Sequence, residues 1–456
     1  MPQLYSMLQD VDANVVTNVI VVLNELLLSD GGMLLTQATV MMVLNRLGEF
    51  SEWGLNAVLD LVSRYRPTGE DEIFAIMNLL DPVLRTANSG AVLATLKCFM
   101  NLAAGFGDLM PQIFARAKPP MLTFVTGANF EVQFAALKHL QVMLVRPAAK
   151  GIFDSEFRQF FVRYNEPSHV KQLKVDLLPL IANDTNAKEI STELGEYVVD
   201  VDAELSRRSI NSLGEIAMRV AGVSDEITQT LVELVDFDIP YVRAQAVKNL
   251  SNIVRVFPAV RVHILPVIAK CLRKVEDASA KSAIVWMLGE YGEEVAEAPY
   301  LLEPIIDNYD DEPSVQIKLH LLTASVQLFF KRPPEVRAML GRLLASAVND
   351  SNNQDLHDRA LLYYRLLGAR DVETARAMFG TVRHIPSTAF AEDQDDDLRQ
   401  KIYAEFNSLA VIFGAPSNQF IADAFQLVRR LTSVISYLLL LLLLLFLLEI
   451  IERAHS

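Results

Sequence analysis

The chain has 456 residues, of which 51% are hydrophobic and 21% are charged, with 19 glycines and 19 prolines. This composition excludes a disordered chain and a collagen-like or linker-dominated one, and the length allows a sizeable core. The net charge of −15, without a block of basic residues, argues against binding to nucleic acid. The first residues, MPQLYSMLQDVD, lack the basic and then apolar order of a secretory signal. Cys98 and Cys271 are too few and too far apart for a disulfide framework, so we expect a reducing, cytosolic compartment.

Helix start signals recur along the chain at a regular spacing. Side chains that can cap a helix N-terminus, each followed by apolar residues at helical spacing, occur about every 38 residues. These predicted caps are Asp12, Ser51, Asn88, Asn129, Asn165, Asp202, Asp238, Asp277, Asp311 and Asn352. A period of this length predicts an all-α fold, a right-handed α-α superhelix of HEAT or armadillo-like helical hairpins.

The clearest repeat runs from Ser224 to Pro258. Its second helix is expected to begin near Asp238, with Pro240 in the first turn, where a proline does no harm. Arg243 completes a D-x-x-x-V-R pattern that is typical of HEAT repeats. One face of this helix is predicted to carry Val242, Ala246, Leu250 and Ile253. Each hairpin exposes an apolar face that its neighbours must cover, so we expect one cooperative array.

The sequence predicts three regions. Residues 1–390 form the helical-repeat array, and residues 391–430 form an acidic loop, from Ala391 to Leu398, followed by an ordered tail. Residues 431–448 carry no charge and include eight consecutive leucines, from Leu438 to Leu445. As a helix they would span roughly 27 Å, just enough to cross a bilayer.

Three interpretations of the segment Leu431–Leu448 remain open. It could be a transmembrane tail anchor, and Arg429 and Arg430 before it would then favour a cytosolic N-terminal side. It could instead be an artefact of the gene prediction, in which non-coding or repetitive sequence is translated past the end of the array. A buried helix that covers the end of the array is disfavoured, because leucine surrounds every side.

The sequence offers no catalytic, cofactor-binding or metal-binding residues. No P-loop, GxGxxG, GxSxG, HExxH or HRD pattern occurs, and the seven histidines are scattered. The acidic pairs at 293–294 and 310–311 are expected to face solvent at helix ends. Tyr363 and Tyr364 are expected to be core residues beside a snorkelling Arg365. We therefore predict a protein-binding scaffold without cofactors, not an enzyme.

Five stretches of the chain resemble the trunk of the β-type large subunits (β-adaptins) of heterotetrameric adaptor complexes. They appear in the family's order and together cover the chain to about Phe425. They are SEWGLNAVLDLVSRYRP (51–67), FFVRYNEPSHVKQLKVDLL (160–178), AIVWMLGEYGEEVAEAPYLLE (283–303), LLTASVQLFFKRPPEV (321–336) and DLHDRALLYYRLL (355–367). The short sequences MLGRLL and ALLYYRLL are most similar to the β subunit of the fourth adaptor complex.

The resemblance implies a fold, a role and partners. The fold is an α-α superhelical trunk, and the role is that of a scaffold in vesicle coat assembly and cargo sorting at the trans-Golgi network or endosomes. The implied partners are a medium chain, a second large subunit and a small chain, on the cytoplasmic face of membranes. Compared with the family, the sequence is expected to lack leading helical hairpins, the hinge and the appendage, and clathrin binding is not expected without the hinge.

Two rival functions stay open at this point. The first is an unrelated HEAT scaffold, such as a karyopherin-like transporter or a phosphatase regulatory subunit. The second is a tail-anchored HEAT-repeat scaffold with another role, attached through Leu431–Leu448 as a single-pass membrane protein.

Overall fold

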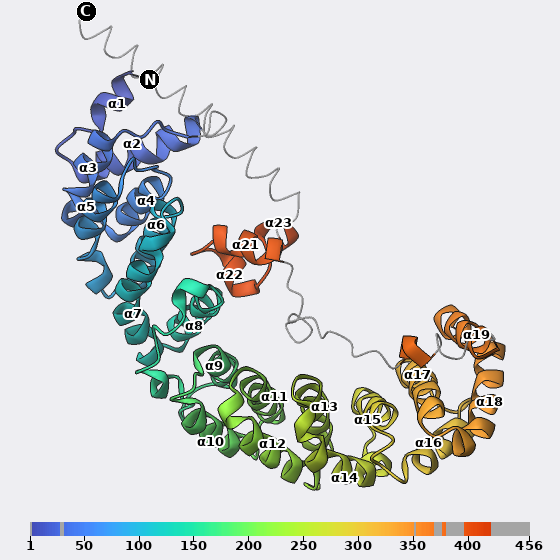
Figure 1. The fold of residues 1–456 in the computed structure, drawn as a ribbon. Helices are drawn as coiled ribbons and strands as arrows, with labels where there is room; N and C mark the ends of the chain where they lie inside the picture. Colours follow the sequence, from blue (N-terminus) through green and yellow to red (C-terminus); the bar gives the residue numbers. More distant parts are fainter. Residues whose placement is uncertain (1, 28–31, 351–352, 369–375, 380–395, 421–456) are drawn as a thin grey trace, which may run out of the picture. The chain divides into compact units, whose positions relative to one another are not determined.

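The computed structural model describes residues 2–27, 32–350, 353–368, 376–379 and 396–420 (Figure 1). In these residues the regular secondary structure is helical, as the periodicity predicts. The helices group into two compact units, one formed by the described residues of 1–155 with 396–420 and the other by those of 156–379.

The first unit is built from successive helices that pack on their neighbours. α2 packs on α4 and α4 on α6, while α3 packs on α5, and α7 contacts both α6 and α8. The helices are α1 (Pro2–Met7), α2 (Ala13–Leu26), α3 (Gln37–Leu44), α4 (Glu52–Val62), α5 (Glu70–Leu80), α6 (Ser89–Leu102), α7 (Met110–Thr126), α8 (Phe130–Leu144), α21 (Asp396–Ala404), α22 (Leu409–Phe413) and α23 (Ser417–Phe420). Short 3-10 helices join them at η2 (Leu47–Glu49), η3 (Val83–Arg85), η4 (Gly107–Leu109) and η5 (Pro147–Ala149).

The second unit consists of two rows of helices (Figure 1). One row is α9 (Ser168–Ile181), α11 (Ala203–Arg219), α13 (Pro240–Val256), α15 (Ala278–Glu290), α17 (Val315–Lys331) and α19 (Gln354–Gly368), each packed on the next. The other row is α10 (Ala187–Tyr197), α12 (Ala221–Val235), α14 (Arg261–Cys271), α16 (Ala298–Asp307) and α18 (Pro333–Asn349). The 3-10 helices are η6 (Phe157–Phe160), η7 (Pro258–Val260) and η8 (Leu272–Lys274). This alternation of rows is the stacked helical-hairpin solenoid that the sequence predicts.

Most of the predicted helix caps are confirmed. The confirmed caps, whose side chains accept backbone N–H groups of the following turn, are Asp12, Ser51, Asn88, Asn129, Asp202 and Asp277. The predictions at Asn165, Asp238 and Asp311 are wrong by one to three residues, since the caps are Pro167, Ile239 and Ser314. At α13 the reason is Pro240, whose fixed φ suits the first helical position and sets the helix start there. Asn352 lies outside the described residues.

The face predicted for α13 is buried. Val242, Ala246, Leu250 and Ile253 are each exposed by 1% or less, and burying a large aliphatic side chain contributes about 1.5–3 kcal/mol. Small residues let helices of one row approach closely. A Cβ placed on Gly289 of α15 would lie 2.6 Å from the Cα of Ala324 in α17, so glycine is required at this crossing.

Residues 396–420 return to the first unit, where α21 and α22 pack on α8 (Figure 1). Phe406, between these two helices, is 1% exposed, and its ring meets that of His139 in α8 edge-on at 4.7 Å. The guanidinium of Arg146 lies 4.1 Å from the centre of the Tyr403 ring. Apolar burial and a cation–π contact therefore hold this C-terminal segment to α8.

The two features predicted beyond the array fall largely outside the described residues. These are residues 391–395 of the acidic loop and the segment Leu431–Leu448. None of the helices in the described ranges is long and apolar enough to cross a membrane. The region boundaries at residues 390 and 430 and the transmembrane segment stay predictions.

Candidate interaction surface

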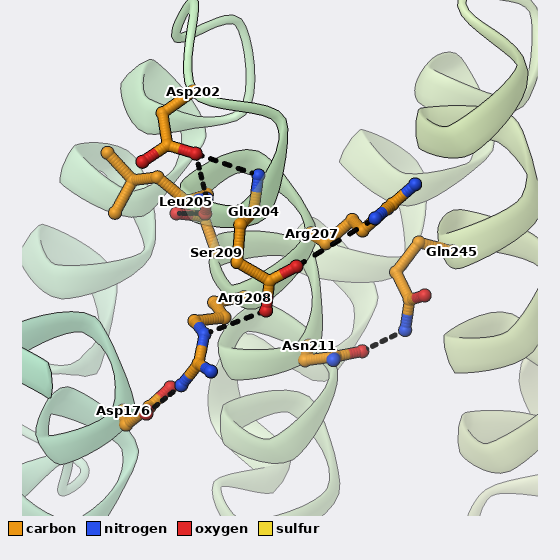
Figure 2. A network of polar contacts seen from close by, with 9 residues as sticks. All are labelled: Asp176, Asp202, Glu204, Leu205, Arg207, Arg208, Ser209, Asn211 and Gln245. Carbon is orange, nitrogen blue, oxygen red and sulfur yellow. Dashed lines mark hydrogen bonds and ion pairs between the residues drawn. The ribbon is translucent and has the colours of Figure 1, made fainter. Parts of the chain in front are cut away.

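A ladder of charged and amide side chains crosses α9, α11 and α13 (Figure 2). Arg208 of α11 donates to Asp176 of α9 at 2.5 Å and to Glu204 of its own helix at 3.1 Å. One turn further along α11, the Asn211 side chain accepts from Asn249 of α13 at 2.9 Å and also from Gln245. We call these six residues the polar ladder. The two ion pairs of Arg208 are partly exposed and are worth about 0–1 kcal/mol each, so they contribute little to the stability of the unit.

Polar contacts continue along the same row beyond α13. Lys248 of α13 lies 3.0 Å from the carboxylate of Asp277, the residue that caps α15. Gln327 of α17 donates to Glu290 of α15 at 2.9 Å. The hydroxyls of Thr323 in α17 and Tyr363 in α19 are 3.1 Å apart. Each helix of the row is thus joined to the next by a polar contact as well as by apolar packing.

The electrostatics of this row favour ionised acids at helix starts. Burial alone would raise the pKa of the Asp277 carboxyl, but the pKa is lowered on balance because the Ala280 N–H and Lys248 stabilise the charged form. The pKa of Asp202 is also lowered against the effect of burial, because the N–H groups of Glu204 and Leu205 donate to it. Both carboxylates also complement the positive end of a helix dipole.

A buried arginine closes the connection between α12 and α13. Arg243 donates through Nε to the carbonyl of Val235 at 3.1 Å and through its two terminal nitrogens to those of Phe237 at 2.7 Å and Lys274 at 3.2 Å. The guanidinium thus satisfies carbonyls at the ends of two helices. These hydrogen bonds explain why the D-x-x-x-V-R pattern has an arginine at this position.

A buried ion pair holds the loop before α9. Lys174 and Glu166, whose side chains are 0% and 2% exposed, are 2.5 Å apart, and the Lys174 ammonium also donates to the carbonyl of Phe161. Burial lowers the pKa of Lys174, although Glu166 acts in the opposite direction. The loop presents Tyr164 to solvent with an exposed fraction of 99%. The helical pattern of the sequence does not predict this pair, although both residues lie within the adaptin-like stretch 160–178.

The histidines, acids and thiols of the described residues do not cluster into a metal site. Within the described ranges, no three His, Cys, Asp or Glu side chains are placed to hold a metal ion. Cys98 and Cys271 are free and buried thiols. Tyr363 is buried as expected, but Tyr364 is 63% exposed, so its assignment to the core is wrong. The error arises because two adjacent helical residues point about 100° apart, and so only one of them faces α17.

The described helices form an extended surface. It is an array of helical hairpins with a polar ladder along one row and an exposed tyrosine on a fixed loop. These features define a helical-repeat scaffold, since such arrays present extended surfaces for other proteins.

Comparison with known proteins gives the family. A family model described as the Adaptin N terminal region matches residues 1–371. The chain belongs to the adaptin N-terminal family, and the resemblance predicted from its sequence is confirmed.

The relatives are β-type proteins. The chain is 38% identical to Beta-adaptin-like protein A of Arabidopsis thaliana over 425 residues, which cover 91% of this chain and 50% of the relative. It is 32% identical to AP-4 complex subunit beta-1 of Mus musculus, covering 90% and 55%, and 29% identical to AP-1 complex subunit beta-1 of Homo sapiens, covering 92% and 44%. The chain thus spans about half the length of these curated relatives, and the subtype stays a prediction, because a second AP-4 beta subunit, from Dictyostelium discoideum, is 29% identical like the AP-1 subunit.

A known structure supports the fold. A chain of a homology model of the full-length AP-3 complex in an intermediate open conformation aligns with a TM-score of 0.58 at 17% identity, covering 82% of this chain and 68% of that one. At this identity the likeness concerns the fold, and it confirms the helical solenoid.

Proposed function

We propose that this chain acts as a non-enzymatic large subunit of a heterotetrameric adaptor complex, a scaffold for vesicle coat assembly and cargo sorting. The observation that carries the proposal is the adaptin family match over residues 1–371, along which helical hairpins succeed one another. A scaffold of this kind needs extended surfaces, and stacked helical hairpins provide them.

The proposed partners are a medium chain, a second large subunit and a small chain. The names of the relatives, which are subunits of the AP-4 and AP-1 complexes, support this assignment. The proposed place of action is the cytoplasmic face of the trans-Golgi network or of endosomes, with peripheral attachment to the membrane through the assembled complex. The net charge of −15 supports protein partners over nucleic acid.

Affinity purification tests the proposal. A tagged form of the full chain is isolated from its own cells, and the proteins that accompany it are identified by mass spectrometry. Recovery of an adaptor medium chain with a second large subunit is the expected result. An eluate without any adaptor subunit, from a chain with an intact helical circular dichroism spectrum, would refute the proposal.

One variant that disrupts the array and one matched control extend the test. Gly289→Leu inserts a side chain where α15 and α17 touch, so it is expected to disrupt the second unit and to lose partners that require it. Arg337→Gln removes one charge from an exposed position on α18 and is expected to keep all partners. Equal recovery of partners with Gly289→Leu would mean that they bind independently of the folded array.

A further inference from the structure

A cleft of about 340 Å³ opens between η3 and α7 in the first unit. Its walls are mostly apolar and come from Leu84 of η3 and from Pro119, Pro120 and Phe124 of α7. The cleft is also lined by the hydroxyl groups of Thr86 and Thr123 and by three charged side chains, those of Asp81, Arg85 and Arg116. The volume lies at the lower end of the range found for ligand sites in proteins, which is about 300–1,000 Å³.

Two adjacent prolines remove backbone donors from this stretch of α7 and add rigid apolar rings. A proline has no N–H, so Pro119 and Pro120 cannot donate to the carbonyls of Ala115 and Arg116 as helical residues normally do. Their rings instead present a rigid apolar surface to the cleft. The Thr123 hydroxyl donates to the carbonyl of Pro119 at 3.0 Å, which fixes this side chain at the edge.

The cleft has more positively charged than negatively charged side chains. Arg116 is engaged by the Asp81 carboxylate, at 2.9 Å from both oxygens, and by the side-chain oxygen of Asn78. Arg85 is exposed, and no acceptor or carboxylate engages it in the part of the chain that the structure describes. The cleft therefore combines apolar walls with one uncommitted positive charge, in a chain whose net charge is −15.

We propose that this cleft binds an acidic and apolar peptide segment of a partner protein. A carboxylate of the peptide pairs with Arg85, and the neighbouring apolar side chain lies against Leu84, Phe124 and the two prolines. Charge complementarity selects the acid, because a guanidinium binds carboxylates in a planar, two-pronged geometry. An isolated inorganic anion would leave the apolar walls uncovered, and one free arginine is far short of the basic cluster that an anionic membrane requires. The inference concerns the first unit and does not depend on the proposed adaptor role.

A peptide array followed by solution binding tests the proposal on the full chain. The array carries short peptides in which aspartate or glutamate adjoins leucine, phenylalanine, tryptophan or proline. Two matched sets replace the acids by their amides or the apolar residues by serine. We expect binding by the acidic and apolar set alone. The strongest peptide, labelled with fluorescein, then gives Kd by fluorescence anisotropy.

Substitutions in the cleft decide the outcome. Arg85→Gln is expected to raise Kd about threefold to fivefold, and Phe124→Ala about fivefold. Arg337→Gln, which removes the same charge from an exposed position on α18, should leave Kd unchanged. Circular dichroism spectra must match between the variants, which is expected for Arg85 because it is exposed. The proposal is overturned if the amide or serine peptides bind equally well, or if Arg85→Gln binds the labelled peptide like the original chain.

Discussion

Two connections in the second unit are each held by a buried basic side chain, but by different chemistry. Before α13, the guanidinium of Arg243 donates to three backbone carbonyls, and the Asp238 carboxylate, 3.8 Å away, is fully exposed. Before α9, the ammonium of Lys174 pairs with the buried carboxylate of Glu166. A guanidinium spreads its charge over several donors and can be satisfied by neutral carbonyls, whereas a compact ammonium in a dry site needs a counter-charge.

The comparison shows that similar connections can differ in how far they depend on one partner. Arg243 donates to several acceptors, so the stability of this connection does not depend on any single one of them. The Lys174 connection depends mainly on one ion pair, and the loss of either member removes the opposite charge that faces the other in a buried site. Trp286, in α15, can report on this unit by fluorescence in a chain where Trp53 is replaced by phenylalanine, because the sequence holds two tryptophans.

The largest expected effect is that of Lys174→Met. Removal of the ammonium leaves the Glu166 carboxylate buried and unneutralised by its present partner, so the free energy of unfolding should fall by about 3–5 kcal/mol. Urea denaturation followed by Trp286 fluorescence measures the change. Adding Glu166→Gln to the same chain should recover part of the loss, and a double variant that is no more stable than Lys174→Met would contradict the explanation.

A smaller effect is expected for Arg243→Lys. The ammonium keeps the charge but cannot reach all three carbonyls, so the free energy of unfolding should fall by about 2 kcal/mol. The same urea titration measures it, with Arg337→Lys at an exposed position of α18 as the control, expected within about 0.5 kcal/mol of the original chain. If Arg243→Lys matched this control, the three hydrogen bonds would not be what secures the connection.

The smallest effect is expected at an exposed pair, Asp277 with Lys248. In Asp277→Asn the amide oxygen still caps α15, but the charge is lost, so the free energy of unfolding should fall by about 0.5–1 kcal/mol at neutral pH. The folded-state pKa of Asp277 is lowered, so its contribution is complete above the pKa of the unfolded chain. The contribution disappears as the pH falls through the lowered value. Urea titrations at a series of pH values should therefore show the two chains converging in acid, and a difference that grows in acid would exclude this origin.

The sequence predicts most of the helix starts at which a polar side chain does the capping, although α17 is capped by Ser314 and not by Asp311. Asp12, Ser51 and Asn88 are examples, because the cap and the apolar spacing that follows it are both local features. The prediction is less accurate where a proline sets the start, as Pro240 does for α13. Local patterns thus suffice for the order of helical hairpins and for the buried face of α13, while exact starts depend on backbone chemistry.

The buried pair and the docked segment could not be predicted from the same patterns. Lys174 and Glu166 are eight residues apart and span a loop, and a lysine and a glutamate are far more often solvated than paired in a core. The contact of Phe406 with His139 joins residues that are distant in the sequence, and no periodicity encodes such a contact. The helical period predicted the fold class and the family resemblance suggested the proposed role, but neither assigned a residue of the polar ladder or of the cleft at Arg85.

The return of residues 396–420 to α8 has a consequence for biosynthesis. The ribosome releases the whole second unit before the last piece of the first, so the nascent chain must carry α8 without its covering helices while more than 200 residues are still being made. During this interval His139 lacks the Phe406 ring that packs against it in the complete fold. The first unit therefore contains both the first and the last described residues to be synthesised.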